Sequence, residues 1–560
     1  MTAPLLRVEN LSVRFGREAP AVVKNVSLSI GAGECLALVG ESGSGKSVTA
    51  RTLIGLTGVG AEVHAKAIAL GSTNLLFASE KKWRSIRGKQ IGFILQDALV
   101  SLDPVRTVGR EIDDTLRLHT DLGPRARRGR VLELLADAGI PDPALTAGQR
   151  SGELSGGLRQ RALIASAIAL SPPLLIADEP TTALDVTIQA QILELLDTLR
   201  ARGTAVLLIT HDLAVVERVA DRVAVMRAGE IVETGLTDAV LANPRHEYTR
   251  RLLLAIPWRH PRGTRLSGES PLSTSPAPAH SPDVRAEPDA ASASPAPVAT
   301  ALEVAPPVLD VIAVSKRFRT PDGDDFQAVE AVSLTLSAGT TLGLVGESGS
   351  GKTTTARIAL GLTRPDTGEV RLIGQPWSAL PEAQRRGRRG LIGAIYQDPL
   401  SSFDPRWTVE RILSDAITNG RSIRPSSQRE RITDLLESVG LSPDLMTRRT
   451  RSLSGGQRQR VSIARAIAAS PRVLICDEPV SSLDVSIQAQ VLDLLDDLQA
   501  SLGLAYLFIS HDLGVIRHVS DRVAVMSKGR IVETGTAEQL FAAPEHPYTQ
   551  RLLASALRRA

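Results

Sequence analysis

One glycine-rich phrase occurs twice in the chain, as GESGSGKSVT from Gly40 and as GESGSGKTTT from Gly346. Further phrases recur in the same order and at nearly constant spacing. LSGGLRQR from Leu154 matches LSGGQRQR from Leu453, and LLITHDLAVVERVADRVAVM matches LFISHDLGVIRHVSDRVAVM. A repeat of this extent indicates one domain written twice. The 560 residues are enough for two large domains, each with its own hydrophobic core.

The sequence between the two copies changes in composition. It is rich in Pro, Ala and Ser, and no aromatic residue occurs from Arg259 through Arg317. Such a stretch cannot bury enough apolar area to offset the entropy lost on ordering. We therefore predict a first domain over residues 1–257, a disordered linker over residues 258–307 and a second domain over residues 308–560.

Each half shows the pattern of an α/β fold. β-branched, partly alternating runs open each copy, and short apolar runs such as CLALV, PLLIAD and AVLLIT then alternate with helical patterns. A helical region is expected in the first half from about residue 103 to residue 170. The alternation predicts a parallel α/β core in each domain.

Both glycine-rich phrases fit a loop that binds phosphate. Each follows an apolar strand and opens a helix, which is the context that the pattern G-x-x-x-x-G-K-[ST] requires. Glycines let backbone N–H groups turn toward an anion, and the helix that follows directs its positive end to the same place. The predicted phosphate-binding residues are Gly40, Ser42, Gly43, Ser44, Gly45, Lys46 and Ser47 in the first half and Gly346, Ser348, Gly349, Ser350, Gly351, Lys352 and Thr353 in the second.

The lysines and hydroxyls of these loops have distinct expected roles. Lys46 and Lys352 would neutralise the β- and γ-phosphates of a nucleotide. Ser47 and Thr353 would offer a hydroxyl to Mg²⁺. The sequence therefore predicts ATP and Mg²⁺ as ligands of both halves.

An Asp-Glu pair ends an apolar strand in each half. Asp178 and Asp477 would complete the shell of the magnesium ion. Glu179 and Glu478, one residue further along, would orient a water molecule for attack on the γ-phosphorus. Both copies keep the complete set, so we predict two hydrolytic sites rather than one site and one relic.

Taken together, these motifs resemble the nucleotide-binding domain of ABC transporters. The resemblance rests also on LSGGL and LSGGQ, on QDALVSLDP from Gln96 and QDPLSSFDP from Gln397, and on His211 and His511. It covers both halves except the linker. The tail H-x-YT-x-RLL, near His246 and His546, is similar more narrowly to the ATPase subunits of dipeptide, oligopeptide and nickel importers.

The resemblance implies a fold and a mode of assembly. Each half would consist of an α/β core, an antiparallel β subdomain and a helical subdomain. The two halves would form an intramolecular pseudo-dimer, in which each ATP is bound by the phosphate loop of one half and the signature turn of the other. Those turns are Ser155, Gly156 and Gly157 in the first half and Ser454, Gly455 and Gly456 in the second.

Further roles follow from the same resemblance. Phe15 and Phe318 would stack on adenine, with an ordinary place in the core as the alternative. His211 and His511 would contact the γ-phosphate, while Gln96 and Gln397 would reach the metal or water and report to the transporter. Leu158 departs from the family pattern, because Gln457 stands at the matching position, and the two sites could therefore be unequal.

Composition limits the remaining functions. Both cysteines, Cys35 and Cys476, fall in apolar runs, no signal peptide or membrane-spanning run is visible, and the net charge is only +4. The resemblance implies a peripheral protein on the cytoplasmic face of the cell membrane, with two permease subunits and an extracytoplasmic solute-binding protein as partners. No nucleic acid is expected.

Two functions are compared. The first is an ATPase subunit that energises import of dipeptides or oligopeptides, with nickel, glutathione or haem as other solutes. The second is a twin ATPase that acts on ribosomes or DNA. That class predicts a charged helical linker, a coiled-coil insertion or paired zinc-type cysteines, and none is visible in the sequence.

Overall fold

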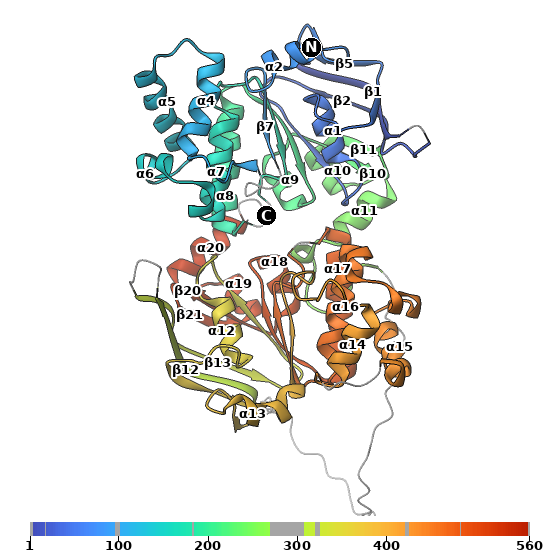
Figure 1. Ribbon diagram of the computed structural model, residues 1–560, viewed down its shortest axis with the longest axis vertical. Coiled ribbons are helices and arrows are strands. Elements are labelled where there is room, and N and C mark those ends of the chain that lie inside the picture. The colour runs from blue at the N-terminus through green and yellow to red at the C-terminus, as the bar shows by residue number, and fades with distance from the viewer. Residues whose placement is uncertain are drawn as a thin grey trace, which may run out of the picture. The chain divides into compact units, whose positions relative to one another are not determined.

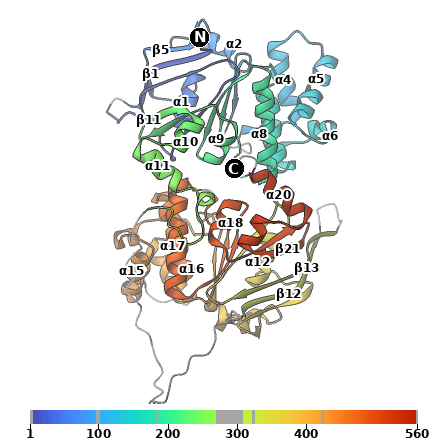
Figure 2. The ribbon, with the colours of Figure 1, turned by 180° about the vertical axis from the view of Figure 1, so that it is seen from behind.

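A computed structural model describes residues 4–16, 18–95, 101–181, 184–268, 307–319, 325–420, 425–481 and 483–557. The chain divides into two compact units, and the main division falls between Ile256 and Pro257. Each unit contains the predicted combination of an α/β core, an antiparallel sheet and a helical region, which confirms the predicted fold class (Figures 1 and 2).

The first domain contains an antiparallel sheet in which the order is β2-β1-β5-β6 and β4 pairs with β1. Its strands are β1 (Leu6–Phe15), β2 (Val23–Ile30), β4 (Ala61–His64), β5 (Ala67–Leu70) and β6 (Thr73–Asn74). The alternating burial along β1 and β2 places one face of this sheet in the core.

A second sheet of the first domain has the order β11-β10-β3-β9-β8-β7, and all of its pairs except β10 with β11 are parallel. Its strands are β3 (Cys35–Val39), β7 (Ile91–Ile94), β8 (Leu174–Asp178), β9 (Ala205–Thr210), β10 (Arg222–Arg227) and β11 (Glu230–Leu236). Every residue of β3, β8 and β9 is buried, because the parallel core is covered on both faces.

The pleat of β8 divides its side chains between two cores. Leu174 and Ile176 pack with the antiparallel sheet, whereas Leu175 and Ala177 pack with the helical region. The strand therefore joins both parts of the domain and places Asp178 at its carboxyl end, where ligands bind in open α/β sheets.

Helices complete the first domain, and α4 to α7 form the helical region (Figure 1). The helices are α1 (Lys46–Leu53), α2 (Glu80–Ile86), α4 (Val108–His119), α5 (Pro124–Asp137), α6 (Pro143–Gly148), α7 (Gly156–Ala167), α8 (Val186–Ala201), α9 (Leu213–Val219), α10 (Thr237–Ala242) and α11 (Glu247–Leu254), with the 3-10 turn η1 (Ser151–Glu153).

The second domain repeats this plan. Its antiparallel sheet has the order β13-β12-β15-β16 and its α/β sheet the order β17-β18-β19-β14-β20-β21. The strands are β12 (Pro307–Arg319), β13 (Asp325–Ser337), β14 (Thr341–Val345), β15 (Thr367–Leu372), β16 (Gln375–Pro376), β17 (Ile392–Ile395), β18 (Val473–Asp477), β19 (Ala505–Ile509), β20 (Arg522–Ser527) and β21 (Arg530–Thr536).

The helices of the second domain follow the same order. They are α12 (Lys352–Ala359), α13 (Glu382–Arg385), α14 (Val409–Ile417), α15 (Arg429–Ser438), α16 (Gly455–Ile467), α17 (Val485–Leu502), α18 (Leu513–Val519), α19 (Ala537–Ala542) and α20 (Pro547–Leu557). The 3-10 turns are η3 (Arg386–Leu391), η4 (Pro425–Gln428), η5 (Pro443–Thr447) and η6 (Thr450–Ser452).

Part of the stretch expected to be a disordered linker is packed. Residues 257–268 begin with the 3-10 turn η2 (Pro257–Arg259) and belong to the second unit, where Leu266 is buried. We call residues 257–268 the strap. This differs from the disorder expected from residue 258 onward, because composition does not register contacts with distant helices. Residues 269–306 lie outside the described residues.

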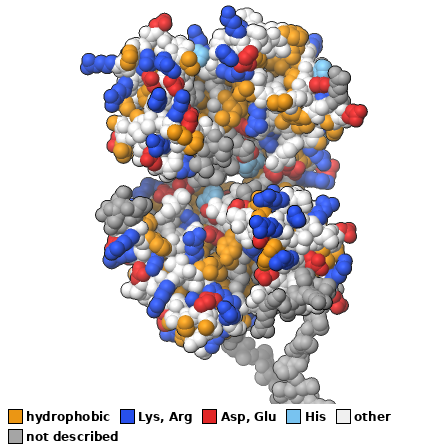
Figure 3. Space-filling model, in the orientation of Figure 1, with side chains coloured by type: hydrophobic (Ala, Val, Ile, Leu, Met, Phe, Trp, Pro, Cys, Tyr) orange, Lys and Arg blue, Asp and Glu red, His pale blue; other side chains and the backbone are white. Residues whose placement is uncertain are grey.

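The surface carries charges of both signs. On the face drawn in Figure 3, basic and acidic side chains are scattered among one another over each domain. Within the described residues, no helix is both long and apolar enough to cross a membrane.

Candidate functional site

The phosphate loop of the first domain is held by its own lysine. Lys46 is buried, and its Nζ donates to the carbonyl oxygens of Gly40 and Glu41 at 2.7 and 2.8 Å. Burial lowers the pKa of Lys46, and the charge of Glu179 counteracts this only in part. The loop therefore encloses the lysine side chain, and its positive charge lies at the N-terminus of helix α1.

Two glycines of this loop have no room for a side chain. Gly40 has a φ of 153°, and a Cβ there would lie 2.1 Å from the carbonyl oxygen of Met226. Gly45 has a φ of 102°, and its Cβ would lie 2.8 Å from the carbonyl oxygen of Val22. No side chain caps α1 at Gly45, so the first backbone N–H groups of this helix can face an anion.

The second domain reproduces this loop closely. Lys352 Nζ donates to the carbonyl oxygens of Gly346 and Glu347, both at 2.7 Å. Gly351 caps α12 with a φ of 105° and, like Gly45, without a side-chain hydrogen bond. Ser42, Gly43, Ser348 and Gly349 are exposed at the tips of the loops, whereas Ser44 and Ser350 are buried.

The predicted metal-binding hydroxyls face the predicted carboxylates. Ser47 Oγ donates to Asp178 Oδ1 at 3.0 Å, and Thr353 Oγ1 donates to Asp477 Oδ1 at 3.4 Å. Asp178 is fully buried, and its Oδ2 has no hydrogen-bond partner among the described residues. Burial raises the pKa of both aspartates. A buried oxygen without a partner, beside a hydroxyl oxygen, fits a hard divalent cation such as Mg²⁺.

The predicted water-orienting glutamates have an unusual backbone. Glu179 and Glu478 have φ values of 50° and 51°, in the left-handed region that non-glycine residues rarely adopt. The N–H of each donates to the strand beside it, to Ile209 and Ile509, at 2.9 Å. A conformation of this kind costs about 1–3 kcal/mol, and both copies keep it at this position.

Each of these glutamates is paired with the predicted histidine. His211 Nδ1 lies 3.2 Å from Glu179 Oε1, and His511 Nδ1 lies 3.1 Å from Glu478 Oε1. Burial alone would lower the pKa of each histidine, but the hydrogen bond and charge of the glutamate outweigh burial and raise it. The pair fixes the direction of both side chains beside the phosphate loop.

Of the two predicted glutamines, Gln397 lies within the described residues. Gln397 Nε2 donates to Glu478 Oε2 at 2.7 Å, so this carboxylate is held from two sides, by Gln397 and by His511. Gln96 lies outside the described residues.

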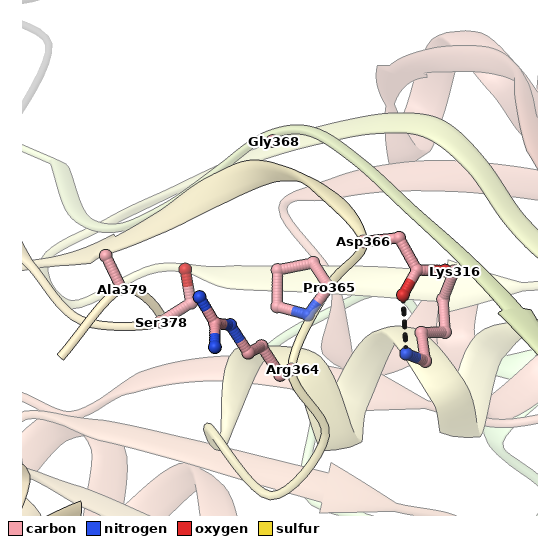
Figure 4. A pocket seen from close by; sticks show the side chains of 7 residues that line it. All are labelled: Lys316, Arg364, Pro365, Asp366, Gly368, Ser378 and Ala379. Atoms are coloured by element: carbon pink, nitrogen blue, oxygen red, sulfur yellow. Dashed lines mark hydrogen bonds and ion pairs between the residues drawn. The ribbon is translucent and has the colours of Figure 1, made fainter. Parts of the chain in front are cut away.

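The predicted base-stacking phenylalanines are exposed. Phe15 at the end of β1 is 38% exposed and Phe318 on β12 is 44% exposed, so neither occupies the core position given as the alternative. A cavity of about 360 Å³ in the second domain is lined by Lys316, Arg364, Pro365, Asp366, Gly368, Ser378 and Ala379 (Figure 4).

In that cavity the ammonium of Lys316 pairs with Asp366 at 2.7 Å and lies 5.7 Å from the centroid of the Phe318 ring. Its lining includes none of the phosphate-loop residues. The cavity is therefore separate from the phosphate site, and Lys316 is the lining residue that lies near the Phe318 ring.

The signature turns begin helices α7 and α16. Ser155 and Ser454 are their N-cap residues, and both serines are exposed. Gly157 and Gly456 face Ile188 and Ile487, which would lie 3.0 and 2.9 Å from an added Cβ. Among the described residues, no hydrogen bond joins either signature serine to the phosphate loop of its own domain.

Sequence reasoning missed two tyrosines that touch the phosphate loops. The hydroxyl oxygen of Tyr248 accepts from the N–H of Glu41 at 3.0 Å, and that of Tyr548 accepts from Glu347 at 3.1 Å. Burial raises the pKa of Tyr248 to about 12, so this hydroxyl stays protonated. The sequence contains a signal for these tyrosines, because the tail H-x-YT-x-RLL is repeated in both halves. Its tyrosine was given no role in the site.

Comparison with known proteins identifies two families that match this chain. The family described as "ABC transporter" matches residues 23–182 and 329–481. The family described as "Oligopeptide/dipeptide transporter, C-terminal region" matches residues 232–280 and 532–559. Both therefore match once in each half.

Similar proteins match along nearly the whole chain. One is the peptidoglycan transport ATP-binding protein YejF of Agrobacterium fabrum, 42% identical over 99% of this chain and 97% of the relative. The glutathione import ATP-binding protein GsiA of Escherichia coli is 42% identical over 98% of this chain and 89% of the relative. The GsiA of Salmonella typhimurium has the same identity and coverage. With two matching domains and relatives of this similarity, the chain belongs to the ABC transporter family, as an ATP-hydrolysing subunit that carries the ATP-binding domain twice.

Proposed function

We propose that both domains hydrolyse ATP with Mg²⁺ and that this hydrolysis energises import of a peptide-class solute. The observation that carries the proposal is that each domain brings a loop lysine, a hydroxyl, an aspartate and a Glu–His pair to the carboxyl edge of one sheet. Neither copy has lost a member of this set.

The residues divide the chemistry between them. Lys46 and Lys352, with the backbone N–H groups that begin α1 and α12, bind and neutralise the phosphates. Glu179 and Glu478 accept a hydrogen bond from the attacking water and direct it toward the γ-phosphorus. His211 and His511 hold those carboxylates in place and contact the γ-phosphate.

Ser47 with Asp178, and Thr353 with Asp477, would hold the metal ion. When bound, Mg²⁺ would supply positive charge that offsets the negative charge developing on the phosphates in the transition state. The same cation would favour the ionised form of the buried aspartates, whose pKa burial raises.

Completion of each site requires a second group of donors, and we assign it to the signature turn of the opposite domain. Serine hydroxyls and backbone N–H groups at the start of α7 and α16 are suited to bind a γ-phosphate. Ser155 and Ser454 are exposed, which leaves both turns accessible to such a ligand.

The partners follow from the transporter family. The subunit would act on the cytoplasmic face of the membrane with two permease subunits and a solute-binding protein. The oligopeptide/dipeptide C-terminal region and a relative that imports glutathione, a tripeptide, support a peptide-class solute. Nickel and haem are the other solutes to test.

Steady-state ATPase measurements on the assembled transporter test the hydrolytic role. Glu179→Gln and Glu478→Gln keep the size of the side chain and remove its charge. We expect each to reduce kcat by at least about 100-fold at its own site. Glu133→Gln, on the exposed face of α5, is the control and leaves kcat unchanged. Full activity of either site variant would remove that residue from the mechanism.

Purification in mild detergent tests the partners. Retention of membrane proteins supports the transporter, and retention of ribosomal RNA or DNA supports the twin ATPase that acts on nucleic acid. The solute-binding protein can then be titrated with a dipeptide, a longer peptide, glutathione, haem and nickel. Binding of nickel or haem alone would overturn the peptide assignment.

A further inference from the structure

The strap is anchored to a buried carboxylate of the second domain. Asp493 on α17 is 3% exposed and accepts hydrogen bonds from the backbone N–H groups of Leu266 and Ser267, both at 2.9 Å. The Ser267 hydroxyl donates to the same carboxylate at 2.5 Å. The Leu266 side chain is 1% exposed. This end of the strap is therefore anchored by three hydrogen bonds to one buried carboxylate and by one buried side chain.

Two arginines of the strap pair with further acids of the second domain. Arg265 lies 2.8 Å from Asp497 on α17, and Arg262 pairs with Asp521 before β20. Arg262 also donates to the side-chain oxygen of Gln499 at 3.3 Å. Each guanidinium is about one third exposed, so these pairs are partly shielded from solvent.

The other end of the strap is aromatic. The ring of Trp258 meets the ring of Phe541 on α19 edge to face, with centroids 5.8 Å apart. The guanidinium of Arg517 on α18 lies 4.7 Å from the Trp258 ring centroid. Contacts of these two kinds stabilise a docked segment beyond the effect of the area they bury.

The duplicated sequence allows the matching positions of the first domain to be compared. In the first domain, Arg200 occupies the position of Gln499 and pairs with Asp221, the counterpart of Asp521, at 3.1 Å. Arg218 occupies the position of His518 and lies 3.8 Å from Glu194, the counterpart of Asp493. The first domain thus supplies both guanidinium groups from its own helices.

The second domain lacks both of those arginines, and the strap supplies guanidinium groups to the same acids. The matching carboxylates also differ in exposure: the side chain of Glu194 is 58% exposed, whereas that of Asp493 is 3% exposed. In the first domain these guanidinium groups come from its own helices, and in the second the strap supplies them.

Three more differences between the copies face Trp258. Gly514 replaces Ala214, and a Cβ there would lie only 3.3 Å from the Trp258 Cβ. Phe541 stands where the first domain has Leu241, and it provides the aromatic partner of Trp258. Arg517 stands where the first domain has Glu217, and it provides the cation over the Trp258 ring. Each difference favours the presence of the strap on the second domain.

We propose that α17, α18 and α19 of the second domain form a docking surface specific for the strap of this same chain. The surface recognises a tryptophan, two guanidinium groups and a buried leucine. Because the strap follows α11 directly along the chain, its docking fastens the first half to the second independently of residues 269–306. This proposal concerns assembly and does not depend on which solute is imported.

The test separates docking from covalent linkage in the full chain. A specific protease site is introduced within residues 269–306, and the purified protein is cleaved without nucleotide. We expect the two fragments of the parent to co-elute in size-exclusion chromatography at the mass of one chain, 59.6 kDa. In Arg262→Ala/Arg265→Ala, we expect the dissociation constant of the fragments to rise at least about tenfold.

Arg125→Ala/Arg128→Ala removes the same charge from the exposed face of α5 and is expected to behave like the parent. Separation of the cleaved parent, or equal retention in the strap variant, would overturn the proposal. A complex of twice the expected mass would show that the strap docks on a second copy, which also contradicts it.

A reversed ion pair distinguishes docking from a folding defect. Arg265→Asp places like charges together and should separate the cleaved fragments. Arg265→Asp/Asp497→Arg restores the attraction with its sign exchanged and should recover association at least in part. Circular dichroism of each uncleaved variant checks that the domains remain folded. Failure of the double variant to improve on Arg265→Asp would argue against a specific contact.

Discussion

Asp496 on α17 is a partly buried carboxyl group, and its ionised form destabilises the folded state. Burial raises its pKa from 3.8 to about 6, against the attraction of Arg262. Above pH 6 the group is ionised in both the folded and the unfolded chain, and the folded state bears the cost of burying the charge. Between pH 6 and pH 4 only the folded state takes up the proton, so this group makes the second domain more stable as the pH falls.

Asp496→Asn should therefore raise the free energy of unfolding of the second domain at pH 8 by about 1–2 kcal/mol. The difference from the parent should shrink as the pH falls through 6, since the parent then becomes neutral at this position as well. Thermal unfolding at several pH values between 4.5 and 8 measures this. Asp434→Asn, exposed on α15, serves as the control; a gain that does not vary with pH would contradict the assignment.

At the scale of elements, the signature helices start differently. Gln457 N–H donates to Ser454 Oγ at 3.3 Å and its side-chain oxygen accepts from Ser454 N–H at 3.1 Å, which is a complete capping box. In the first domain, Leu158 N–H donates to Ser155 Oγ at 3.4 Å, and leucine cannot return the second bond. The departure noted in the sequence thus has a structural counterpart at the start of α7.

Gln457→Leu should remove one bond of the box and lower the free energy of unfolding of the second domain by about 0.5–1 kcal/mol. Leu158→Gln should gain less, because Leu158 also packs against the helical core. Urea unfolding of both variants compares the two effects. An unchanged midpoint for Gln457→Leu would show that the reciprocal bond contributes nothing.

The H-x-YT tail is anchored by a glutamate of the preceding strand. Glu533 on β21 accepts from the N–H groups of Glu545 and His546 at 2.8 and 3.1 Å. Burial alone would raise the pKa of Glu533, but hydrogen bonds lower it below 4.5. The stabilisation is complete above pH 4.5 and is lost as the pH falls through the lowered pKa.

Glu533→Gln should accordingly lower the unfolding temperature of the second domain near pH 7, and the difference from the parent should vanish in acid. Calorimetry between pH 3.5 and pH 7 measures it, with Glu538→Gln on α19 as the exposed control. A variant that loses the same stability at every pH would point to packing rather than charge.

The sequence was sufficient to predict those parts of the structure that depend on residues close together in the chain. A strand, glycines and a lysine at fixed spacing define the phosphate loop, so the positions of Lys46 and Lys352 followed from the chain alone. The strap did not, because Trp258 and Arg265 acquire partners more than 200 residues away. Composition reports what a segment can bury by itself and carries no information about a distant helix that receives it.

For the whole molecule, the duplication predicts two nucleotide sites in each chain. Glu179→Gln/Glu478→Gln should slow hydrolysis at both sites and retain two ATP molecules in equilibrium dialysis of the assembled transporter. Adding Lys46→Ala should reduce this to one, since it removes the cation of one loop only. Retention of a single ATP by the double variant would mean that one copy does not bind nucleotide.

The two cysteines of the chain are both shielded inside central strands. Cys35 lies in β3 and Cys476 in β18, and burial raises the pKa of Cys35 to about 12 and that of Cys476 further. Maleimide dyes should therefore not react with the native thiols of the folded protein. A fluorophore pair attached at two introduced surface cysteines would then report the separation of the two halves throughout a catalytic cycle, with no native residue replaced to make labelling selective.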